Sequence, residues 1–343
     1  MGTVIAFRIL VASLRGTEVA IYDYAVANEE VLGNTSIILI DSSGNHTQSV
    51  IDKFTKRFHV YFYSSIIDIE QILLSYKCRV LYTIAYGERR VNNPTLSING
   101  VYKTALHCVF SMSDPHADTY IPISKYLAKK FGMQLNVPHM ISVKLSLNPV
   151  KELIQGIKYK EKLNIPSNAI VFGRHGGLET FNIDFVHKTI RYIVERNTDI
   201  YFLFVNTYKF INHKQVIFLP PIISNTEKVT FIMACDAMLH ARADGETFGI
   251  ACGEFSVCNK PVITCTCGDT SHIDILGEKC ITYSNEKELQ DILLNFLNIK
   301  IKKEGELLAQ NNHPGRLWDA YTKNYSAETV INLWWKLLIE PCL

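Results

Sequence analysis

The sequence has few of the features that mark membrane, nucleic-acid-binding or metal-dependent proteins. It contains no uncharged apolar run of about 18 residues, the length that spans a membrane as a helix. Its formal net charge is +2, and its 35 Lys and Arg residues are spread along the chain. A protein that binds nucleic acid usually gathers such residues on one face. We therefore expect neither a transmembrane segment nor a nucleic-acid partner.

Motifs of several enzyme classes are absent as well. No strand-like run is followed by G-x-G-x-x-G, which disfavours a dinucleotide-dependent oxidoreductase. No Asp-x-Asp motif stands at the end of such a run, so we expect a reaction that needs no metal ion. Cys265 and Cys267 form the one close cysteine pair, and no matching His or Cys pair lies at zinc spacing. The sequence therefore predicts no metal site.

The cysteines also indicate a compartment. They are odd in number, nine in all, and most lie within apolar runs. The first residues do not have the pattern of a secretory signal. Such cysteines are typical of small buried side chains in a reducing environment rather than of a disulfide framework. We therefore expect free thiols, Cys265 and Cys267 included, in a cytoplasmic protein.

The chain does have enough apolar material for two packed domains. It has 343 residues, of which 48% are hydrophobic, and a chain of this length usually divides into two cores. Apolar runs typical of strands recur in both halves, separated by helix-period segments such as 18–33 and 182–197. These runs are 3–10, 36–41, 59–63, 79–85 and 105–110, then 169–173, 199–206, 215–219, 234–241 and 260–265. Each half therefore predicts a doubly wound α/β domain with a parallel, Rossmann-like sheet.

The segment between the two halves sets the domain boundary. Residues 136–169 carry three prolines and a cluster of lysines, which is typical of an exposed connection. We place the first domain at 1–145 and the second at 146–325, with a cleft between them. Residues 326–343 form a C-terminal helix.

In open α/β sheets, ligands bind beyond the carboxyl ends of the strands. After the first strand, Gly16 and Thr17 could open a helix whose free N–H groups bind an anion, although the same pair is equally typical of a plain helix start. Arg174 follows a strand directly, and Gly176 and Gly177 let a ligand approach the backbone, although two glycines are also a common turn. The loop 111–120 brings three polar side chains together, those of Asp114, His116 and Asp118.

The fourth post-strand segment, 243–263, contains an isolated carboxylate. Glu254 stands alone in the otherwise uncharged run 247–259, and an ionised Glu is rarely buried without a partner. We predict that Thr247 caps a helix beginning at Phe248-Gly249, whose N-terminus favours phosphate. Glu246 precedes this helix, and eight residues place the two carboxylates up to about 12 Å apart. Together they describe a nucleotide-sugar site; the alternative is that Glu254 pairs with a buried Lys or Arg.

Glu246 and Glu254, with Thr-Phe-Gly after the first and Lys-Pro-Val-Ile six residues after the second, resemble a known signature. It is the Glu-x7-Glu motif of retaining, nucleotide-sugar-dependent glycosyltransferases of the GT-B fold, family 4 type. The likeness extends to the Gly16 loop, to 169–177, to the Pro-His-Ala-Asp at 115–118 and to the helix 327–338. It implies two Rossmann-like domains facing a central cleft, with the last helix returning to the first domain.

The resemblance also implies roles for the candidate residues. Glu246 holds the transferred sugar, and Glu254 holds the ribose. His116, Glu246 and Arg174 are the catalytic set, and Asp114, Asp118 and His107 are candidates to contact the sugar or the acceptor, with Asp118 fixing the ring of His116 or its loop. The donor contacts are Gly16, Thr17, Arg174, Gly176, Arg242, Glu246, Thr247, Phe248, Gly249 and Glu254. The implied reaction moves a sugar from a UDP- or GDP-type donor to a glycan or other hydroxyl acceptor with retention. It needs no cofactor besides this co-substrate.

One position departs from the family pattern. Family members usually have a Lys five residues after the Arg that corresponds to Arg174, and here that position is Glu179. Lys188, Arg242 and Arg15 are candidates to replace the missing cation, which would stabilise the leaving diphosphate. The departure favours one alternative, a non-catalytic nucleotide-sugar-binding subunit. A nucleotide-sugar epimerase of the same fold is the other alternative, because it would use the same donor contacts.

Overall fold

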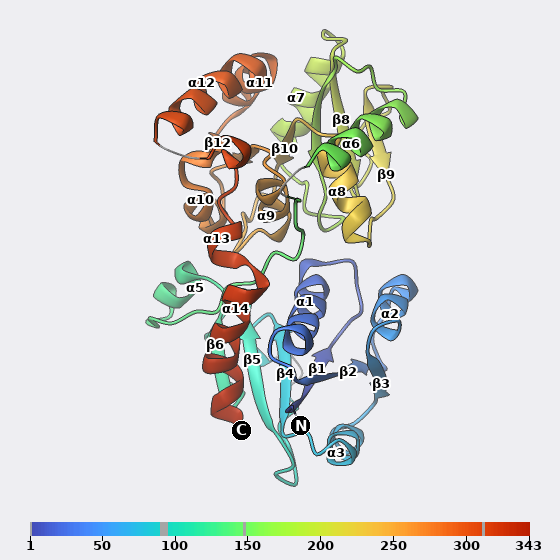
Figure 1. The fold of residues 1–343 in the computed structure, drawn as a ribbon, viewed down its shortest axis with the longest axis vertical. Helices are drawn as coiled ribbons and strands as arrows, with labels where there is room; N and C mark the ends of the chain where they lie inside the picture. Colours follow the sequence, from blue (N-terminus) through green and yellow to red (C-terminus); the bar gives the residue numbers. More distant parts are fainter. Residues whose placement is uncertain (1, 90–94, 147–148, 311–312) are drawn as a thin grey trace. The chain divides into compact units, whose positions relative to one another are not determined.

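The computed structural model describes residues 2–89, 95–146, 149–310 and 313–343 (Figure 1). The chain forms two compact units. Unit 1 contains Met1–Ser142 and Asn324–Leu343, and unit 2 contains Val143–Lys323. Each unit has a sheet of six parallel strands flanked by helices. The predicted fold class, two doubly wound α/β domains, is confirmed.

Unit 1 begins with a buried apolar strand and alternates strands with helices. All six residues of β4 are buried, as expected for the centre of a parallel sheet. The elements are β1 (Val4–Ile9), α1 (Gly16–Glu30), β2 (Thr35–Asp41), α2 (Gln48–Thr55), β3 (His59–Tyr63), α3 (Ile66–Ser75), β4 (Val80–Ala85), β5 (Lys103–Cys108), β6 (Thr119–Pro122), α5 (Lys125–Lys130) and α14 (Ala327–Trp334).

The end of the chain packs into unit 1. Helix α14 lies against α1, and the fully buried Trp334 stacks on the rings of Phe7 and Tyr24. The N–H of Ile141 donates to the carbonyl of Tyr325 at 2.8 Å. A π-helical turn at Trp335–Ile339 and a 3-10 turn at Glu340–Cys342 continue the packing against β5.

Unit 2 repeats the alternation of strands and helices. Its elements are α6 (Val150–Lys162), β7 (Ile170–Arg174), α7 (Asp184–Val194), β8 (Ile200–Val205), β9 (Val216–Leu219), α8 (Asn225–Met233), β10 (Ala237–His240), α9 (Ile250–Val257), β11 (Val262–Cys265), α10 (Ser271–Leu276), β12 (Cys280–Tyr283), α11 (Glu286–Leu294) and α12 (Phe296–Ala309), with 3-10 turns at Gly277–Lys279 and Pro314–Arg316. The short helix α13 (Thr322–Tyr325) begins in unit 2 and ends in unit 1.

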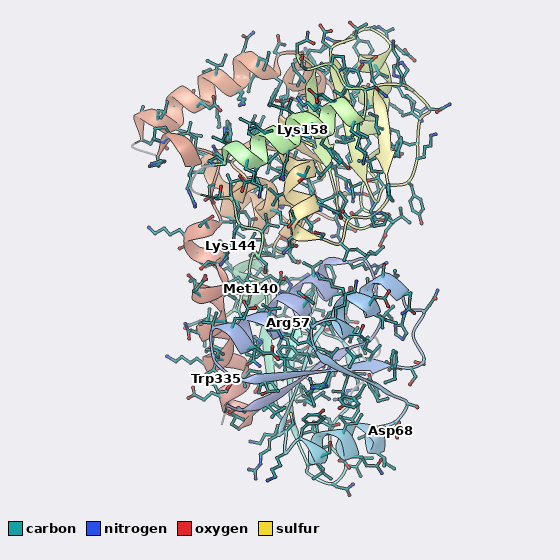
Figure 2. All side chains as sticks on the ribbon, turned by 45° about the vertical axis from the view of Figure 1, so that its right-hand side comes forward. Arg57, Asp68, Met140, Lys144, Lys158 and Trp335 are labelled. Carbon is teal, nitrogen blue, oxygen red and sulfur yellow. A yellow bond between two sulfur atoms is a disulfide. The ribbon has the colours of Figure 1, made fainter. Side chains whose placement is uncertain are left out.

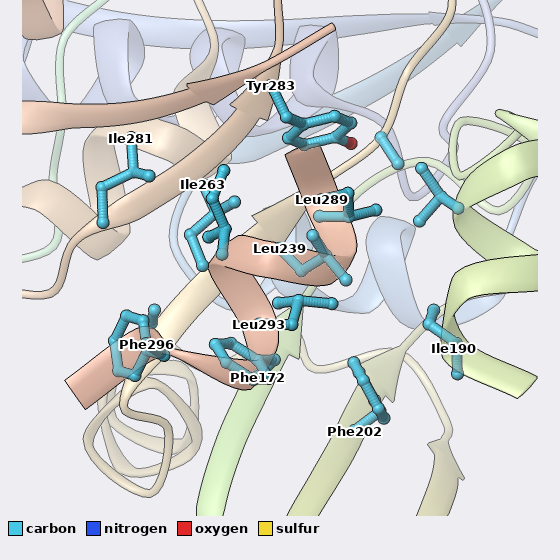
Figure 3. Close-up of a cluster of buried hydrophobic side chains, with 14 of the residues drawn as sticks. Phe172, Ile190, Phe202, Leu239, Ile263, Ile281, Tyr283, Leu289, Leu293 and Phe296 are labelled. Atoms are coloured by element: carbon cyan, nitrogen blue, oxygen red, sulfur yellow. The ribbon is translucent and has the colours of Figure 1, made fainter. Parts of the chain in front are cut away.

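The core of unit 2 lies between its sheet and the helices α7 and α11 (Figure 3). Phe172 and Phe202 project from neighbouring strands, and Ile190 of α7 and Leu293 of α11 cover them. All four side chains are fully buried. Burial of side chains of this size stabilises the fold by about 1.5–3 kcal/mol each. This packing gives the loops beyond the strands a rigid base.

Some helix ends follow local capping rules. Ser65 accepts a hydrogen bond from the N–H of Asp68, and the Asp68 carboxylate, labelled in Figure 2, accepts one from the N–H of Ser65. This capping box fixes the start of α3.

Among the described residues, no helix is both long enough and apolar enough to cross a membrane.

Two short strands differ from the sequence expectations. β6 overlaps the segment 111–120, which was predicted as a loop. β12 lies in a part of the chain for which no strand was predicted. Each strand has only four residues and lies at the edge of its sheet. β6 also ends at Pro122, a residue that sheets accept mainly at edges. Length alone is not the reason, because β9, β10 and β11 also have four residues and were predicted. Pro122 ends the apolar residues of β6, and Thr282 interrupts those of β12.

The two sheets share one topology. The strand order is β3-β2-β1-β4-β5-β6 in unit 1 and β12-β11-β10-β7-β8-β9 in unit 2, which is the same order counted from β7. The direction of winding changes between β7 and β10, which are paired. At such a switch point, the loops after the two strands diverge and leave room for a ligand. In unit 2 these are the loops that follow Arg174 and His240.

The cysteines meet the expectation in part. Seven of them are free and buried: Cys78, Cys108, Cys235, Cys252, Cys258, Cys280 and Cys342. Cys265 and Cys267 are joined by a disulfide, so the expectation of free thiols is wrong for this pair. Their Cα atoms are 5.3 Å apart, within the range that a disulfide spans.

Candidate functional site

The loop after β10 is held by its neighbour after β11. The N–H of Glu246 donates to the carbonyl of Asp269 at 2.8 Å, and the N–H of Asp269 donates to the carbonyl of Asp244 at 2.8 Å. Gly245 has a φ of 67°, and a Cβ there would lie 2.1 Å from the carbonyl oxygen of Asp269. Only glycine fits this close approach. The backbone on which Glu246 stands is therefore fixed.

The start of α9 differs from the prediction. The helix begins at Ile250 with Gly249 as its N-cap, so the predicted Thr247 cap is wrong. Gly249 has a left-handed φ of 76°, which ends the loop two residues later than a Thr247 cap would. Phe248 is buried, and its carbonyl accepts a hydrogen bond from the hydroxyl of Tyr321 at 3.0 Å. The first residue of α9 therefore lies four positions after Glu246.

The Glu246 carboxylate contacts two basic groups. Its Oε1 lies 3.3 Å from Nε2 of His240, and its Oε2 accepts from the Arg242 guanidinium at 3.2 Å. Burial alone would raise the pKa of Glu246, but His240 and Arg242 outweigh it and lower the pKa to about 2. The carboxylate is therefore ionised at neutral pH.

A chain of hydrogen bonds continues from Glu246 into the core. Nδ1 of His240 lies 2.8 Å from the hydroxyl of Thr264, and this hydroxyl lies 2.8 Å from Nε2 of His272. Because Glu246 is ionised, Nε2 of His240 is the donor of the hydrogen bond between them. The Thr264 hydroxyl lies between the other nitrogen of His240 and Nε2 of His272. The chain fixes both ring orientations behind the carboxylate.

Glu254 has the partner that its isolation in the sequence called for. Its Oε1 lies 2.5 Å from Nζ of Lys228, and its Oε2 lies 3.0 Å from Nε2 of His175. Burial would raise the pKa of Glu254, but Lys228 and His175 lower it to about 2. This pairing with a buried Lys matches the alternative interpretation of Glu254. It also brings His175, from the loop after β7, to the helix after β10.

Arg174 ends β7 and ties the following loops together. Its guanidinium donates to the carbonyls of Asn206 at 2.9 Å and Gly177 at 2.6 Å, and to the hydroxyls of Thr207 and Thr180 at 2.6 and 2.5 Å. Burial lowers the pKa of Arg174 to about 10, which leaves it charged. The negative charge of the nearby Glu246 partly offsets the effect of burial, because it raises the pKa of Arg174. In this structure, the guanidinium of Arg174 holds the surrounding loops together through these hydrogen bonds.

The remaining cations proposed for the diphosphate differ in position. Arg242 contacts Glu246. Lys188 is exposed on α7, and Arg15 is the exposed residue before α1. Glu179 is exposed in the loop that contains Gly176. The buried cation that the structure adds to this set is Lys228, whose side chain is 8% exposed.

In unit 1, Gly16 is the first residue of α1, and Thr17 follows it. Arg15 is the N-cap and makes no side-chain cap bond. Glu18, in the same first turn, is buried and accepts a hydrogen bond from the Ser13 hydroxyl at 2.8 Å. Burial raises the pKa of Glu18 to about 7, against the smaller opposing effects of Ser13 and Arg15. Sequence reasoning did not single out this residue.

The loop before β6 contains His116, which is buried. Its Nδ1 lies 2.6 Å from the carbonyl of Asp114, and its ring meets Tyr120 edge-on. With Arg8 and Thr83, among others, it lines a cavity of about 20 Å³, enough for about one water. The Asp114 carboxylate lies 3.7 Å from the Arg89 guanidinium.

Of the two roles expected for Asp118, fixing the ring of His116 or fixing its loop, the structure shows the second. Its carboxylate accepts hydrogen bonds from the N–H of Thr104 at 2.7 Å and from its hydroxyl at 3.0 Å. It therefore fixes the loop to β5, and the ring of His116 is held by the Asp114 carbonyl instead. A carboxylate two residues from a histidine need not face it, because the backbone turns between them.

His107 lies in the core of unit 1. Its Nδ1 is 2.8 Å from the hydroxyl of Tyr82, and its Nε2 is 2.7 Å from the carbonyl of Val137. Burial lowers the pKa of His107 to about 4, so the ring is neutral. Both nitrogens already have protein partners, which is the pattern of a structural histidine.

Solved structures share this architecture. The chain is similar to HepE (Alr3699) of Anabaena in complex with UDP-glucose, with a TM-score of 0.71 and 12% identity over 96% of this chain and 97% of that chain. It is similar to a glycosyltransferase from Rickettsia africae, with a TM-score of 0.68 and 14% identity over 99% and 98% of the two chains. It is also similar to WaaG, a glycosyltransferase involved in lipopolysaccharide biosynthesis, with a TM-score of 0.57 and 12% identity over 96% and 95%.

Neither a protein-family model nor a curated protein matches the sequence itself. At 12–14% identity the structural likeness shows the fold. That fold is GT-B, with two Rossmann-like domains.

Proposed function

We propose that the chain is a glycosyltransferase that moves a sugar from a UDP- or GDP-type nucleotide sugar to a hydroxyl acceptor such as a glycan, with retention of configuration. The observation that carries the proposal is the pair of carboxylates Glu246 and Glu254, one before and one within α9. Both are held ionised by basic neighbours. They lie in the segment after β10, at the switch point where such sheets bind ligands. The fold supports the same class.

In the proposed site, Glu246 accepts hydrogen bonds from hydroxyls of the transferred sugar, and Glu254 accepts one from the ribose. A carboxylate has about four acceptor positions, so Lys228 and His175 do not exhaust those of Glu254. The N–H groups at Thr247, Phe248 and Gly249 and the N-terminus of α9 favour the phosphates between the sugars. Gly176 and Thr17 belong to the loops that complete the donor contacts.

Lys228 is the residue that we propose in place of the missing cation at position 179, where the chain has Glu179. Its ammonium group is buried and reaches Glu254 from α8, a different element from the one where the family pattern places its Lys. With Arg174 and Arg242, it supplies the positive charge that the leaving diphosphate requires. We therefore propose that the donor is held without a metal ion.

In unit 1, we propose that His116 hydrogen-bonds the transferred sugar or orients the acceptor, and that Asp114 contacts the acceptor. Gly16, at the N-terminus of α1, is assigned to the donor phosphates. His116→Ala then lowers turnover by more than it lowers donor affinity, since the residue acts on the reaction rather than on the nucleotide. Wild-type turnover at saturating substrates would show that His116 is structural.

The experiment that tests the proposal measures nucleoside diphosphate released from UDP- and GDP-sugars, with and without EDTA. We expect slow release by the wild-type protein at equal rates in both conditions. Glu246→Gln lowers the rate by about 10- to 150-fold, the equivalent of one charge-assisted hydrogen bond. The matched control is Glu286→Gln, which changes a Glu outside the site in the first turn of α11. Loss of activity in EDTA, restored by magnesium, would contradict the metal-free site.

A second candidate is a non-catalytic nucleotide-sugar-binding subunit, which Glu179 in place of a cation favours. The same assay separates the two candidates. Binding of a nucleotide sugar in calorimetry, with no diphosphate released in the presence of any acceptor, supports the binding subunit. Release of nucleoside diphosphate together with a free 2-acetamido sugar supports an epimerase. We propose a cytoplasmic location on the basis of the seven free buried thiols; the Cys265–Cys267 disulfide is the exception to that pattern.

A further inference from the structure

Three side chains with metal-binding atoms converge behind Glu246. His240, Cys252 and His272 are buried, and one ligand atom of each lies within 4.8 Å of the other two. They come from three elements, the end of β10, the first turn of α9 and the start of α10. A Cβ at Gly249 would lie 2.9 Å from Cβ of His272 and 3.5 Å from Sγ of Cys252. The glycine therefore lets these groups approach.

The hydroxyl of Thr264 holds one nitrogen of each histidine, Nδ1 of His240 and Nε2 of His272. The other nitrogen of His240, Nε2, faces Oε1 of Glu246 at 3.3 Å. The other nitrogen of His272, Nδ1, is buried and makes no hydrogen bond of full geometry within the described part of the chain, although the backbone of Glu246 and Asp269 lies near the ring. A buried polar atom left without a partner is costly, so its presence calls for a reason. A shared outer partner that orients two rings is typical of metal sites.

We propose that Nε2 of His240, Sγ of Cys252 and Nδ1 of His272 bind a divalent cation of the borderline-soft class, for which Zn²⁺ is the type, with Oε1 of Glu246 as the fourth ligand. Two nitrogens, a sulfur and a carboxylate oxygen are the donor set that zinc takes with tetrahedral geometry. Magnesium and calcium prefer oxygen ligands throughout and do not fit this set. Arg242 holds the other oxygen of Glu246 at 3.2 Å, which leaves Oε1 for the metal.

The distances and charges fit this cation. Ligand atoms of a tetrahedral zinc site lie about 3.5 Å apart, so binding draws the ligand atoms of His240, Cys252 and His272 together by about 1.3 Å at most. Oε1 of Glu246, already 3.3 Å from Nε2 of His240, reaches the cation by a further movement of its side chain. Binding displaces the proton of the Cys252 thiol to solvent and shifts the ring proton of His240 from Nε2 to Nδ1, where it faces the Thr264 hydroxyl. The thiolate and the Glu246 carboxylate then balance the two positive charges. The site forms and releases without any oxidation.

The cation has a consequence that rests on the proposed function. Glu246 is the carboxylate assigned to the transferred sugar, and a metal that takes its Oε1 withdraws it from the sugar. The structure therefore assigns to zinc the role of an inhibitor of transfer, which a chelator reverses. This agrees with a catalytic site that needs no metal of its own.

The test uses Co²⁺ as a spectroscopic probe of the full chain, in the presence of a phosphine reductant. We expect one equivalent to bind and give visible bands of tetrahedral cobalt and a near-ultraviolet thiolate charge-transfer band, both abolished by Zn²⁺. Cys252→Ser removes the charge-transfer band. Cys258→Ser is the matched control, since Cys258 is a buried thiol at the end of the same helix, and it keeps the band. A Cys265→Ser/Cys267→Ser double variant also keeps it.

Absence of the band in the wild-type protein, or its persistence in Cys252→Ser, would overturn the site. Should Cys252→Ser fold poorly, His272→Gln provides the second variant, with an affinity for Co²⁺ at least tenfold weaker. Release of nucleoside diphosphate in added Zn²⁺ tests the consequence. A cobalt band in a protein with no transferase activity supports the metal site and contradicts the proposed function. Transfer unaffected by a saturating metal contradicts the assignment of Glu246 to the sugar.

Discussion

Glu18 of unit 1 and Glu254 of unit 2 are both glutamates buried within helices, yet their pKa values shift in opposite directions. Burial raises the pKa of Glu18 to about 7, because Ser13 and Arg15 only partly offset it. Glu254 meets a comparable penalty, but Lys228 and His175 bring its pKa to about 2. Burial thus sets the cost of the charge, and the neighbours decide whether the charge persists.

The comparison separates two kinds of carboxyl group. Near neutral pH, Glu18 carries a proton for much of the time, so it is a poor acceptor for a ligand hydroxyl. Glu254 and Glu246 stay ionised, and an ionised carboxylate accepts the stronger hydrogen bonds. The difference teaches why unit 2 is the better candidate for holding the hydroxyl groups of a donor.

The largest expected effect on stability comes from removing the lysine that keeps Glu254 ionised, which leaves Glu254 in an environment closer to that of Glu18. Lys228→Met leaves the Glu254 carboxylate with His175 as its remaining basic contact, and breaking a buried ion pair costs about 3–5 kcal/mol. We expect a loss of about this size in the free energy of unfolding, measured with urea. Lys287→Met, at an exposed position of α11, is the control.

A double variant, Lys228→Met with Glu254→Leu, sharpens this comparison. Replacing both members of a buried pair with apolar groups is often neutral, so most of the lost stability returns. Stability unchanged in the single variant would mean that the pair contributes nothing and that the comparison with Glu18 is misdrawn.

The second effect concerns Glu18 and pH. Its folded pKa of about 7 exceeds the ordinary 4.5, so the folded state binds the proton more tightly and loses stability as pH rises from 4.5 to 7. The shift of 2.5 units corresponds to about 3 kcal/mol. Glu18→Gln removes this loss, so its stability relative to the wild type rises by about that amount between pH 4.5 and pH 8.

Denaturant unfolding at the two pH values measures this effect, and Glu30→Gln, on the exposed end of the same helix, is the control. A difference between Glu18→Gln and wild type that stays constant from pH 4.5 to pH 8 would show that Glu18 titrates normally.

The smallest effect tests the support behind Glu246. Thr264→Val keeps the side-chain shape but removes the hydroxyl between His240 and His272, which leaves buried ring nitrogens without a partner. We expect a loss of about 1–3 kcal/mol in unfolding free energy. Thr264→Ser keeps the hydroxyl and retains most of the stability. Unchanged stability in Thr264→Val would show that the hydroxyl does not support the two rings.

Much of the fold was accessible from the sequence. The continuous apolar runs around Phe172 and Phe202, with the amphipathic helix that contains Ile190, predicted a parallel sheet covered by helices, and the structure confirms it. The edge strands β6 and β12 were missed because Pro122 ends the apolar residues of the first and Thr282 interrupts those of the second. Hydrophobic periodicity records which residues are buried, and it does so best for long elements.

The site was accessible only in part. The isolation of Glu254 showed that it needs a partner, but Lys228 lies 26 positions away on another helix, where no spacing rule connects them. His240 and His272 meet through Thr264, a contact made by the folding of three elements. The helix start at Gly249 was missed because its left-handed backbone depends on the surrounding loops.

Calorimetric titration of UDP or GDP, whichever raises the melting temperature of the wild-type protein, tests the central claim most directly. The claim is that the buried carboxylate held ionised by Lys228 and His175 accepts hydrogen bonds from the donor. Glu254→Gln is predicted to weaken binding by about 1.5–3 kcal/mol, roughly 10- to 150-fold, while Glu18→Gln binds within about twofold of the wild type. Circular dichroism first establishes that both variants are folded. Equal affinities in all three proteins would contradict the account.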